Sequence, residues 1–176
     1  LDAAGAAGAE RFVLLGDIVG YGPDPAWCIE KSRELVAAGA ICLRGNHDDA
    51  AAGGAVSLNG TARAAIEWTK ERLDAAQTAF LAGLPLTVED EDRLYVHADG
   101  SSPARWHYVT DCESAALHFN ATQKRVSFCG HVHQPALYSR LAQGHVTAFT
   151  PSSAAPIPLL PQRRWLAVRG AVGQPR

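Results

Sequence analysis

The sequence predicts an α/β fold in which strands and helices alternate along one domain of residues 1–176. Short apolar runs rich in branched or aromatic residues alternate with longer segments whose apolar residues recur at helical spacing. A hydrophobic share of 47% is enough for a globular core, and a length of 176 residues suits a single domain.

Four of the apolar runs are the strands on which the functional argument depends. Each is followed by a polar cluster that contains Gly, Asn or His; the runs are residues 12–15, 40–43, 94–96 and 126–129. In sheets wrapped by helices, ligands bind in the crevice beyond the carboxyl ends of the strands. We therefore expect the four polar clusters to line one pocket.

Segments between these strands have helical patterns, and we expect helices at residues 25–38, 61–73, 75–81 and 111–120. The first has Pro25 in its first turn and ends near Gly39. The last has Asp111 as its cap and Glu113 in its first turn. Residues 1–10 are rich in Ala and Gly and are typical of a helix end.

From residue 136 the pattern changes to short strands. We expect these strands at residues 137–141, 145–149 and 165–168. The Pro- and Ser-containing residues 150–161 separate the last two and predict a surface loop.

Charge and cysteine usage limit the classes of function. The formal net charge of −2 argues against extended nucleic-acid binding, whereas a small phosphorylated substrate remains compatible. No apolar run approaches the roughly 20 residues that span a bilayer, so we expect no membrane association. The four cysteines, which form no C-x-x-C pair, are Cys28, Cys42, Cys112 and Cys129. This usage favours buried free thiols and a reducing compartment, so we expect a cytoplasmic protein.

The first two polar clusters contain residues suited to metal and proton chemistry. Asp17 lies in a Gly-flanked turn where its two oxygens can bridge two cations, although such a residue is also a common turn former. In the cluster that begins at Gly45, the Asn46 amide oxygen can ligate a metal and His47 can protonate a leaving oxygen. Asp48 can hold the imidazolium, while a capped turn is the structural alternative.

The last two clusters contribute histidines. His131 and His133 are two residues apart and would face the same side of an ideal strand, from which a loop could turn them onto two adjacent metals. His97 ends its strand and by itself also fits a structural role. We expect His107, His118 and His145, which belong to no motif, to be structural or surface residues.

Four clusters occur in order along the chain: G-D-x-x-G at Gly16, G-N-H-D at Gly45, V-H at Val96 and G-H-V-H at Gly130. Together they resemble the motifs of the calcineurin-like metallophosphoesterase superfamily, in its branch of small bacterial phosphodiesterases and phosphatases. The resemblance implies a two-sheet β-sandwich flanked by helices in four αββα layers. It also implies a centre of two divalent metal ions, which can be Mn, Fe, Zn or Ni.

The resemblance assigns a role to each of these residues. Asp17 would bridge the two metals, and His133 would serve the second metal. The first metal would be completed by Asn46, His97 and His131. The catalytic pair would be His47, as general acid, and Asp48, which orients it. The substrate would be bound by Asn46, His47 and Arg44, with Tyr21 also in the pocket; strand-end packing explains Arg44 and Tyr21 equally well.

The expected reaction is an in-line attack on a phosphomonoester or phosphodiester by a hydroxide that bridges the two metals. His47 would protonate the departing alkoxide, which contributes about 10²–10⁴ in rate. The sequence does not select the substrate, the metals or the oligomeric state.

Three departures from the family pattern affect these expectations. The family's Asp-x-His motif, which supplies two ligands to the second metal, is missing before Gly16, where residues 1–10 contain only Asp2. The chain also has no Met, so we expect it to lack its natural beginning, including an opening strand, and its second metal site to be incomplete. The other departures are Asp99, where the family commonly has Ser, and residues 168–171, where it commonly has an Asn-Pro-Gly-Ser turn.

Three interpretations therefore remain open. The chain is a hydrolase whose second metal uses solvent and another carboxylate, a pseudoenzyme or fragment that acts as a metal- and phosphate-binding module, or a mononuclear zinc hydrolase.

Overall fold

The computed structural model describes residues 1–142, 144–151 and 156–174, and the chain forms two compact units, Leu1–Leu84 and Pro85–Arg176. We call them the N-terminal and C-terminal units. Both combine strands with helices, which confirms the predicted α/β class. The expectation of one domain over residues 1–176 remains a prediction. Within the described ranges, no helix is long and apolar enough to cross a membrane.

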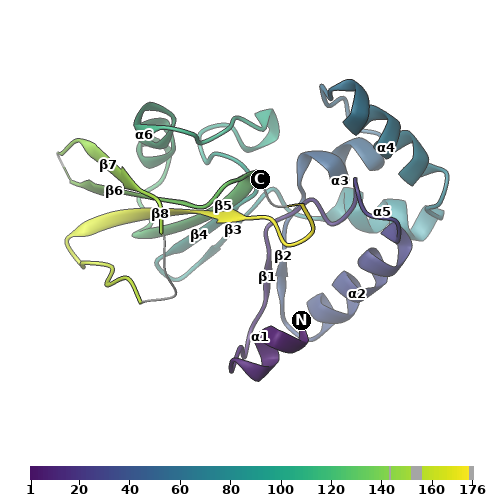
Figure 1. Ribbon diagram of the computed structural model, residues 1–176, viewed down its shortest axis with the longest axis horizontal. Helices are drawn as coiled ribbons and strands as arrows, with labels where there is room; N and C mark the ends of the chain where they lie inside the picture. The colour runs from purple at the N-terminus through teal and green to yellow at the C-terminus, as the bar shows by residue number, and fades with distance from the viewer. Residues whose placement is uncertain (143, 152–155, 175–176) are drawn as a thin grey trace. The chain divides into compact units, whose positions relative to one another are not determined.

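The N-terminal unit contains a short parallel sheet and five helices (Figure 1). The parallel strands are β1 (Val13–Leu14) and β2 (Ile41–Cys42). The helices are α1 (Asp2–Ala6), α2 (Pro25–Ala37), α3 (Asn46–Ala51), α4 (Gly60–Lys70) and α5 (Ala75–Gly83). Because α2 is the connection between two parallel strands, both strands run toward the edge where the first two polar clusters follow.

Local sequence explains where these helices start. Pro25 occupies the first turn of α2, where the missing N–H has no helical partner to lose. Asp74 caps α5: its carboxylate accepts the Gln77 N–H at 2.8 Å, and the Gln77 side chain accepts the Asp74 N–H at 3.1 Å. α3 was not predicted, because six residues are too few to show a helical period.

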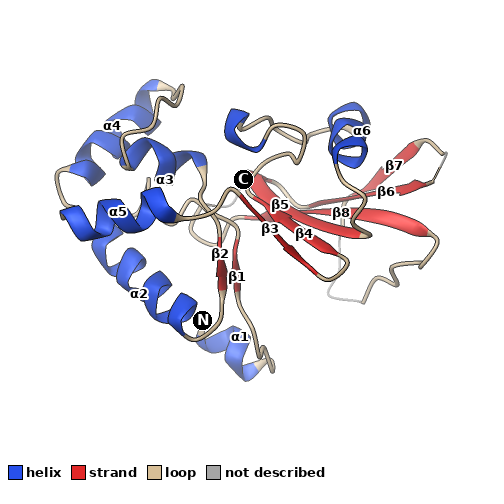
Figure 2. Cartoon of the chain, turned by 180° about the vertical axis from the view of Figure 1, so that it is seen from behind, coloured by secondary structure: helices blue, strands red, loops and turns tan. Residues whose placement is uncertain are grey.

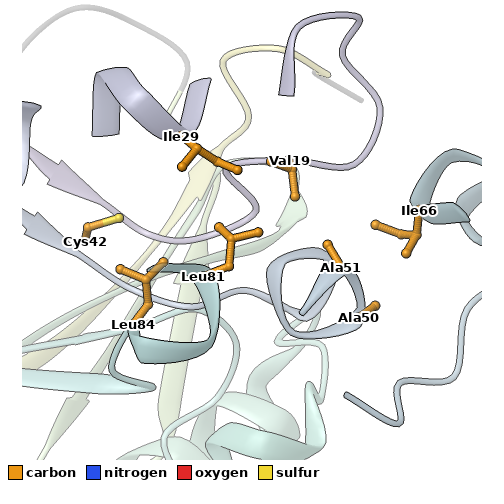
Figure 3. Close-up of a cluster of buried hydrophobic side chains, with 8 residues drawn as sticks. All are labelled: Val19, Ile29, Cys42, Ala50, Ala51, Ile66, Leu81 and Leu84. Atoms are coloured by element: carbon orange, nitrogen blue, oxygen red, sulfur yellow. The ribbon is translucent and has the colours of Figure 1, made fainter. Parts of the chain in front are cut away.

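A cluster of buried side chains from the strands, helices and intervening turns forms the core of the N-terminal unit (Figure 3). Ile29 of α2 and Leu81 of α5 are fully buried, and burying such a side chain contributes about 2 kcal/mol. Ala50 and Ala51 of α3 join the same cluster, as does Val19 from the turn after β1. This packing holds α3 beside that turn.

The C-terminal unit is built on a mixed six-stranded sheet in the order β3-β4-β5-β8-β6-β7 (Figure 2). The strands are β3 (Thr87–Asp90), β4 (Arg93–Val96), β5 (Val126–His133), β6 (Ala136–Leu141), β7 (Val146–Phe149) and β8 (Arg163–Gly170). β5 pairs in parallel with β4 and β8, and the other pairs are antiparallel. Helix α6 (Cys112–Ala121) packs over β6 and β7, and η1 (Pro103–Arg105) precedes it.

Two strands differ from the sequence prediction. β3 was not predicted, because its T-V-E-D sequence is polar. Among the described residues it is an edge strand that pairs with β4 alone, and it leaves alternate side chains exposed. β5 continues past the predicted end at residue 129, through a register shift between Cys129 and His133. In the predicted loop 150–161, residues 152–155 lie outside the described part, and residues 156–160 form no helix or strand.

The expectation of buried thiols was wrong for Cys112 and holds only in part for Cys28. All four cysteines are free, and Cys42 and Cys129 are buried, whereas Cys28 is partly buried and Cys112 is exposed. Cys112 is the first residue of α6, where its side chain lies outside the core cluster that Ala115 and Phe119 of the same helix join.

Candidate metal centre

Asp17 lies in the turn after β1, against the backbone at the start of α3. Its φ is +55°, a left-handed conformation that costs a non-glycine residue about 1–2 kcal/mol. Gly45 allows the close approach, because an added Cβ there would overlap both the Asp17 carboxylate and its backbone N. The glycine of the G-N-H-D cluster is therefore required by packing against Asp17.

Helix α3 carries the next three predicted residues at its first turn. Asn46 and His47 are 7% and 6% exposed, and Asp48 is fully buried. The backbone N–H of His47 donates to Asp17 Oδ1 at 3.0 Å. A carboxylate at the start of a helix is favourable because the first backbone N–H groups have no partner within the helix.

The His47 ring is enclosed by the turn between β1 and α2. Its centroid lies 4.7 Å from that of the Tyr21 ring, at an interplanar angle of 56°. At Gly20, whose φ is +138°, an added Cβ would overlap the imidazole at Nδ1. The structure thus brings Tyr21 to the predicted general acid, and the second glycine of G-D-x-x-G leaves room for its ring.

Asp48 accepts hydrogen bonds from four backbone N–H groups. Oδ2 accepts from Asp17 at 2.8 Å and from Gly45 at 2.9 Å. Oδ1 accepts from Ile18 at 2.8 Å and from Val19 at 3.2 Å. These bonds join the turn after β1 to the start of α3, a role that the local sequence did not indicate.

Arg44 has an acidic neighbour that sequence analysis did not single out. One of its terminal guanidinium nitrogens lies 3.2 Å from Asp49 Oδ1, and both side chains are about three-quarters buried. Asp49 follows the motif directly on α3, but no spacing rule distinguishes it from an ordinary helix-start acid.

In the C-terminal unit, the structure brings His97 and His131 together. His97 follows β4 and His131 lies near the end of β5, so both are at the carboxyl ends of neighbouring parallel strands. His97 Nε2 is 3.2 Å from His131 Nδ1, and both side chains are buried. Two imidazole nitrogens at this separation either share one proton or direct lone pairs at a common cation.

The loop before α6 sets the orientation of the His131 ring. His131 Nε2 lies 2.9 Å from the backbone oxygen of Trp106, which can only accept, so Nε2 carries the proton and Nδ1 presents a lone pair. Tyr108 stacks on the same ring at a centroid distance of 4.1 Å, and the Trp106 ring meets His97 edge-on at 5.8 Å. Metal-binding histidines commonly donate their other N–H to a carbonyl in this way.

Trp106 and Tyr108 were missed by the sequence prediction. They flank His107 in a W-H-Y sequence that has no periodic or motif signal, and only the loop path places them at His131. The one sequence feature that could have pointed to them is an aromatic pair that follows the predicted ligand His97 within about a dozen residues.

A buried carboxylate anchors this loop. Asp99 is 2% exposed and its Oδ1 accepts from the Ser101 N–H at 2.7 Å and from the Ser101 hydroxyl. His107 Nδ1 lies 3.6 Å from Asp99 Oδ2. Asp99 therefore links Ser101 and His107 of this loop.

His118 of α6 supports the same loop from inside the core. Its Nδ1 accepts the Gly100 N–H at 3.0 Å, and its side chain is fully buried. Burial lowers the pKa of His118 to about 4, so the ring is neutral near pH 7. This agrees with the structural role expected for it.

His133 makes a separate interaction at the end of β5. Its Nδ1 lies 2.8 Å from the backbone oxygen of Gln174, which can only accept, so Nδ1 is the donor of this bond. The register shift in β5 lies between Cys129 and His133. The ideal-strand expectation for residues 131 and 133 therefore does not apply to this part of β5.

Backbone strain is concentrated at the predicted ligands. The non-glycine residues with positive φ among those described are Asp17, Glu91, Trp106, His131 and His133. Three are predicted metal ligands, and Trp106 bonds to one of them. Such conformations persist where the surroundings enforce them and are common at functional sites.

The donor atoms of both units fit divalent metals. They comprise carboxylate and amide oxygens in the N-terminal unit and imidazole nitrogens in the C-terminal unit. In the neutral ring, the hydrogen bond from His131 Nε2 to Trp106 leaves Nδ1, which faces His97 Nε2, able to bind a cation. Mixed N and O donors suit Mn, Fe, Zn and Ni without choosing among them.

Comparison with known proteins identifies relatives. The family model of the calcineurin-like phosphoesterase superfamily domain matches residues 1–168. The uncharacterized protein MJ0912 of Methanocaldococcus jannaschii is 30% identical over 176 residues, which cover 96% of this chain and 67% of that protein.

Solved structures agree with this match. The crystal structure of a metallophosphoesterase from Sphaerobacter thermophilus is 32% identical with a TM-score of 0.79, over 99% of this chain and 72% of that chain. The hypothetical protein PH1004 of Pyrococcus horikoshii has a TM-score of 0.64 over 98% of this chain and 81% of that chain. At 15% identity, this second likeness supports the fold alone.

Proposed function

The chain belongs to the calcineurin-like phosphoesterase superfamily, and from this premise we propose that it hydrolyses phosphomonoesters or phosphodiesters with two divalent metal ions. The observation that carries the proposal is the buried pair of His97 Nε2 and His131 Nδ1, whose orientation the Trp106 carbonyl sets. His131 also has a left-handed backbone, which costs free energy and is common at functional sites, whereas packing alone does not require it.

In this proposal, five side chains would hold the metals. Asp17 would serve both ions, Asn46, His97 and His131 would complete the first, and His133 would serve the second. When bound, two divalent ions lower the pKa of water, which supplies a hydroxide near pH 7, and neutralise charge that develops on the phosphoryl oxygens.

The residues of α3 act on the substrate. His47 protonates the departing alkoxide, and its place at the buried first turn, with Tyr21 against the ring, keeps it out of bulk water. Asn46, His47 and Arg44 contact the phosphate. The ion pair between Arg44 and Asp49 restrains the guanidinium before the substrate binds.

A second candidate function is a metal- and phosphate-binding module without turnover. Residues 1–10 contain Asp2 and no Asp-x-His motif, and such a module would require no ligand beyond those described above. Both candidates use the same residues, so only turnover separates them.

Hydrolysis of an activated aryl phosphodiester in Mn²⁺ tests the proposal. We expect activity that a chelator abolishes and that His47→Ala lowers by about 10²–10⁴, because the substitution removes the proton donor. His145→Ala is the matched control, since it makes the same change at an exposed histidine outside the site. Absence of turnover by folded protein that binds Mn²⁺ would instead establish the binding module.

We also propose a cytoplasmic location. It is supported by the four cysteines, all of which are free, as expected in a reducing compartment.

A further inference from the structure

We propose that Asp48 is a positioning residue that holds the Asp17 carboxylate for metal binding, and that it acts through metal affinity more than through the proton supplied by His47. The inference rests on the proposed function, because it takes Asp17 to be a metal ligand. It changes the role that the motif alone suggests, which is to orient the His47 imidazole.

The first step is the placement of the Asp48 carboxylate. It is 0% exposed, and a carboxylate is stable without water only where hydrogen bonds replace its hydration. Four backbone N–H groups do so, at 2.8 to 3.2 Å. Three of them belong to the consecutive residues Asp17, Ile18 and Val19, so Asp48 defines the path of the turn that carries the metal ligand.

The second step is that the restraint is reciprocal. Asp17 Oδ1 accepts the His47 N–H at 3.0 Å, while Asp48 Oδ2 accepts the Asp17 N–H at 2.8 Å. The turn therefore bonds to α3 through both backbone and side chain. Asp17 has a φ of +55°, which an unrestrained Asp rarely adopts, so removal of these bonds allows the turn to relax away from the ligating conformation.

The third step is that an amide cannot replace the carboxylate. In Asp48→Asn, one oxygen still accepts two N–H groups, but the amide nitrogen would face the other two N–H groups and can only donate. Two of the four charge-assisted bonds are lost, at least one of them from the turn, while the volume of the side chain is nearly unchanged. Asp49→Asn is the matched control, because it makes the same change at the next residue of α3, whose carboxylate contacts Arg44 instead.

The experiment compares Mn²⁺ dissociation constants of the full chain, its Asp48→Asn variant and its Asp49→Asn variant by isothermal titration calorimetry. We expect Asp48→Asn to raise Kd about 10–100-fold, the usual effect of losing a residue that orients a ligand. Asp49→Asn should bind Mn²⁺ as the unaltered chain does. At saturating Mn²⁺, the kcat of Asp48→Asn should be close to that of the unaltered chain. Its kcat should also fall at alkaline pH over the same range (the alkaline limb of the pH profile), because the proton donor His47 is unaffected.

The outcomes separate this inference from the proposed function. If the unaltered chain binds no Mn²⁺, the proposed function fails. If it binds Mn²⁺ and Asp48→Asn binds equally well, or if kcat stays low at saturating Mn²⁺ while the alkaline limb moves, the inference is overturned and Asp48 acts on His47.

Hydrogen exchange keeps the inference testable if Asp48→Asn does not fold. In the unaltered chain, the Ile18 and Val19 amides should be protected from exchange, because both donate to the buried Asp48 carboxylate. Exchange of these amides as fast as in an unstructured loop would overturn the inference without any variant.

Discussion

Single residues in this protein owe their properties to burial as much as to their chemical type. His118 and Asp99 are both almost wholly buried, yet the first is kept neutral by its lowered pKa and the second is compensated by bonds to Ser101. The thiols show the same dependence. Burial raises the pKa of Cys42 and of Cys129 to about 12, and it raises the pKa of Cys28 by less.

Thiol alkylation should therefore distinguish the four cysteines. At pH 8 we expect Cys112 to react first, because it is exposed, while Cys42 and Cys129 stay protonated and shielded. Iodoacetamide labelling followed by peptide mass spectrometry checks the order. The urea-unfolded chain is the control, in which all four should react at similar rates. Early labelling of Cys129 in the folded chain would contradict the expectation.

At the scale of elements, the β3–β4 hairpin contains one strained residue. Glu91 occupies the tight turn between β3 and β4 with a φ of +52°, at the opposite end of β4 from His97. A glycine adopts this conformation without steric cost, and it is the residue that mirror-image hairpin turns favour.

Glu91→Gly should stabilise the chain by about 0.5–1 kcal/mol, which is the left-handed penalty less the added chain entropy of the unfolded state. Urea unfolding measures the change. Glu91→Ala is the control, because it also removes the exposed contact with Arg93 at 3.4 Å but keeps the strained φ. Equal stability of the two variants would show that backbone strain is not the cause.

Strands β4 and β5 show how elements determine a site. Their parallel pairing places the residue after β4 beside the end of β5, which brings His97 within 3.2 Å of His131 although 34 residues separate them. The register shift in β5 then turns residues after Cys129 away from a regular pleat. A strand of ordinary geometry would point His131 and His133 to one side, as the sequence alone predicted.

At the scale of the whole molecule, each unit has a core of its own, and the C-terminal core contains a titratable group. His118 is fully buried there, next to Phe119 of the main cluster. Its pKa of about 4 in the folded chain lies below the ordinary value of 6.5. Between these two values the unfolded chain binds a proton that the folded chain does not, so stability falls as the pH is lowered from about 6.5 to about 4.

The free energy of unfolding should consequently drop by at most about 3 kcal/mol over this pH range through His118. His118→Asn should reduce the pH dependence, because the amide oxygen can still accept the Gly100 N–H but does not titrate. Urea unfolding at several pH values, with chelator present to exclude linkage to metal binding, makes the comparison. An unchanged pH dependence in the variant would rule out His118 as its source.

Much of the fold and of the site was accessible from sequence because the signals are local. Pro25, Asp74 and Asp111 lie at helix starts, and apolar runs predicted, to within a few residues, seven of the eight strands found in the described part of the chain. Helix α3 and strand β3 escaped prediction, since a six-residue helix shows no period and an edge strand needs few apolar residues.

By itself, the sequence determined the family, the α/β class and the chemical types of the candidate ligands, because motifs, caps and periodicity are properties of neighbouring residues. Only the tertiary structure decided that Asp48 holds the Asp17 turn, that Gly45 must lack a side chain, and that Trp106 sets the tautomer of His131. These facts depend on contacts between residues 25 or more positions apart, and the spacing of such residues along the chain says nothing about their distance in the folded state.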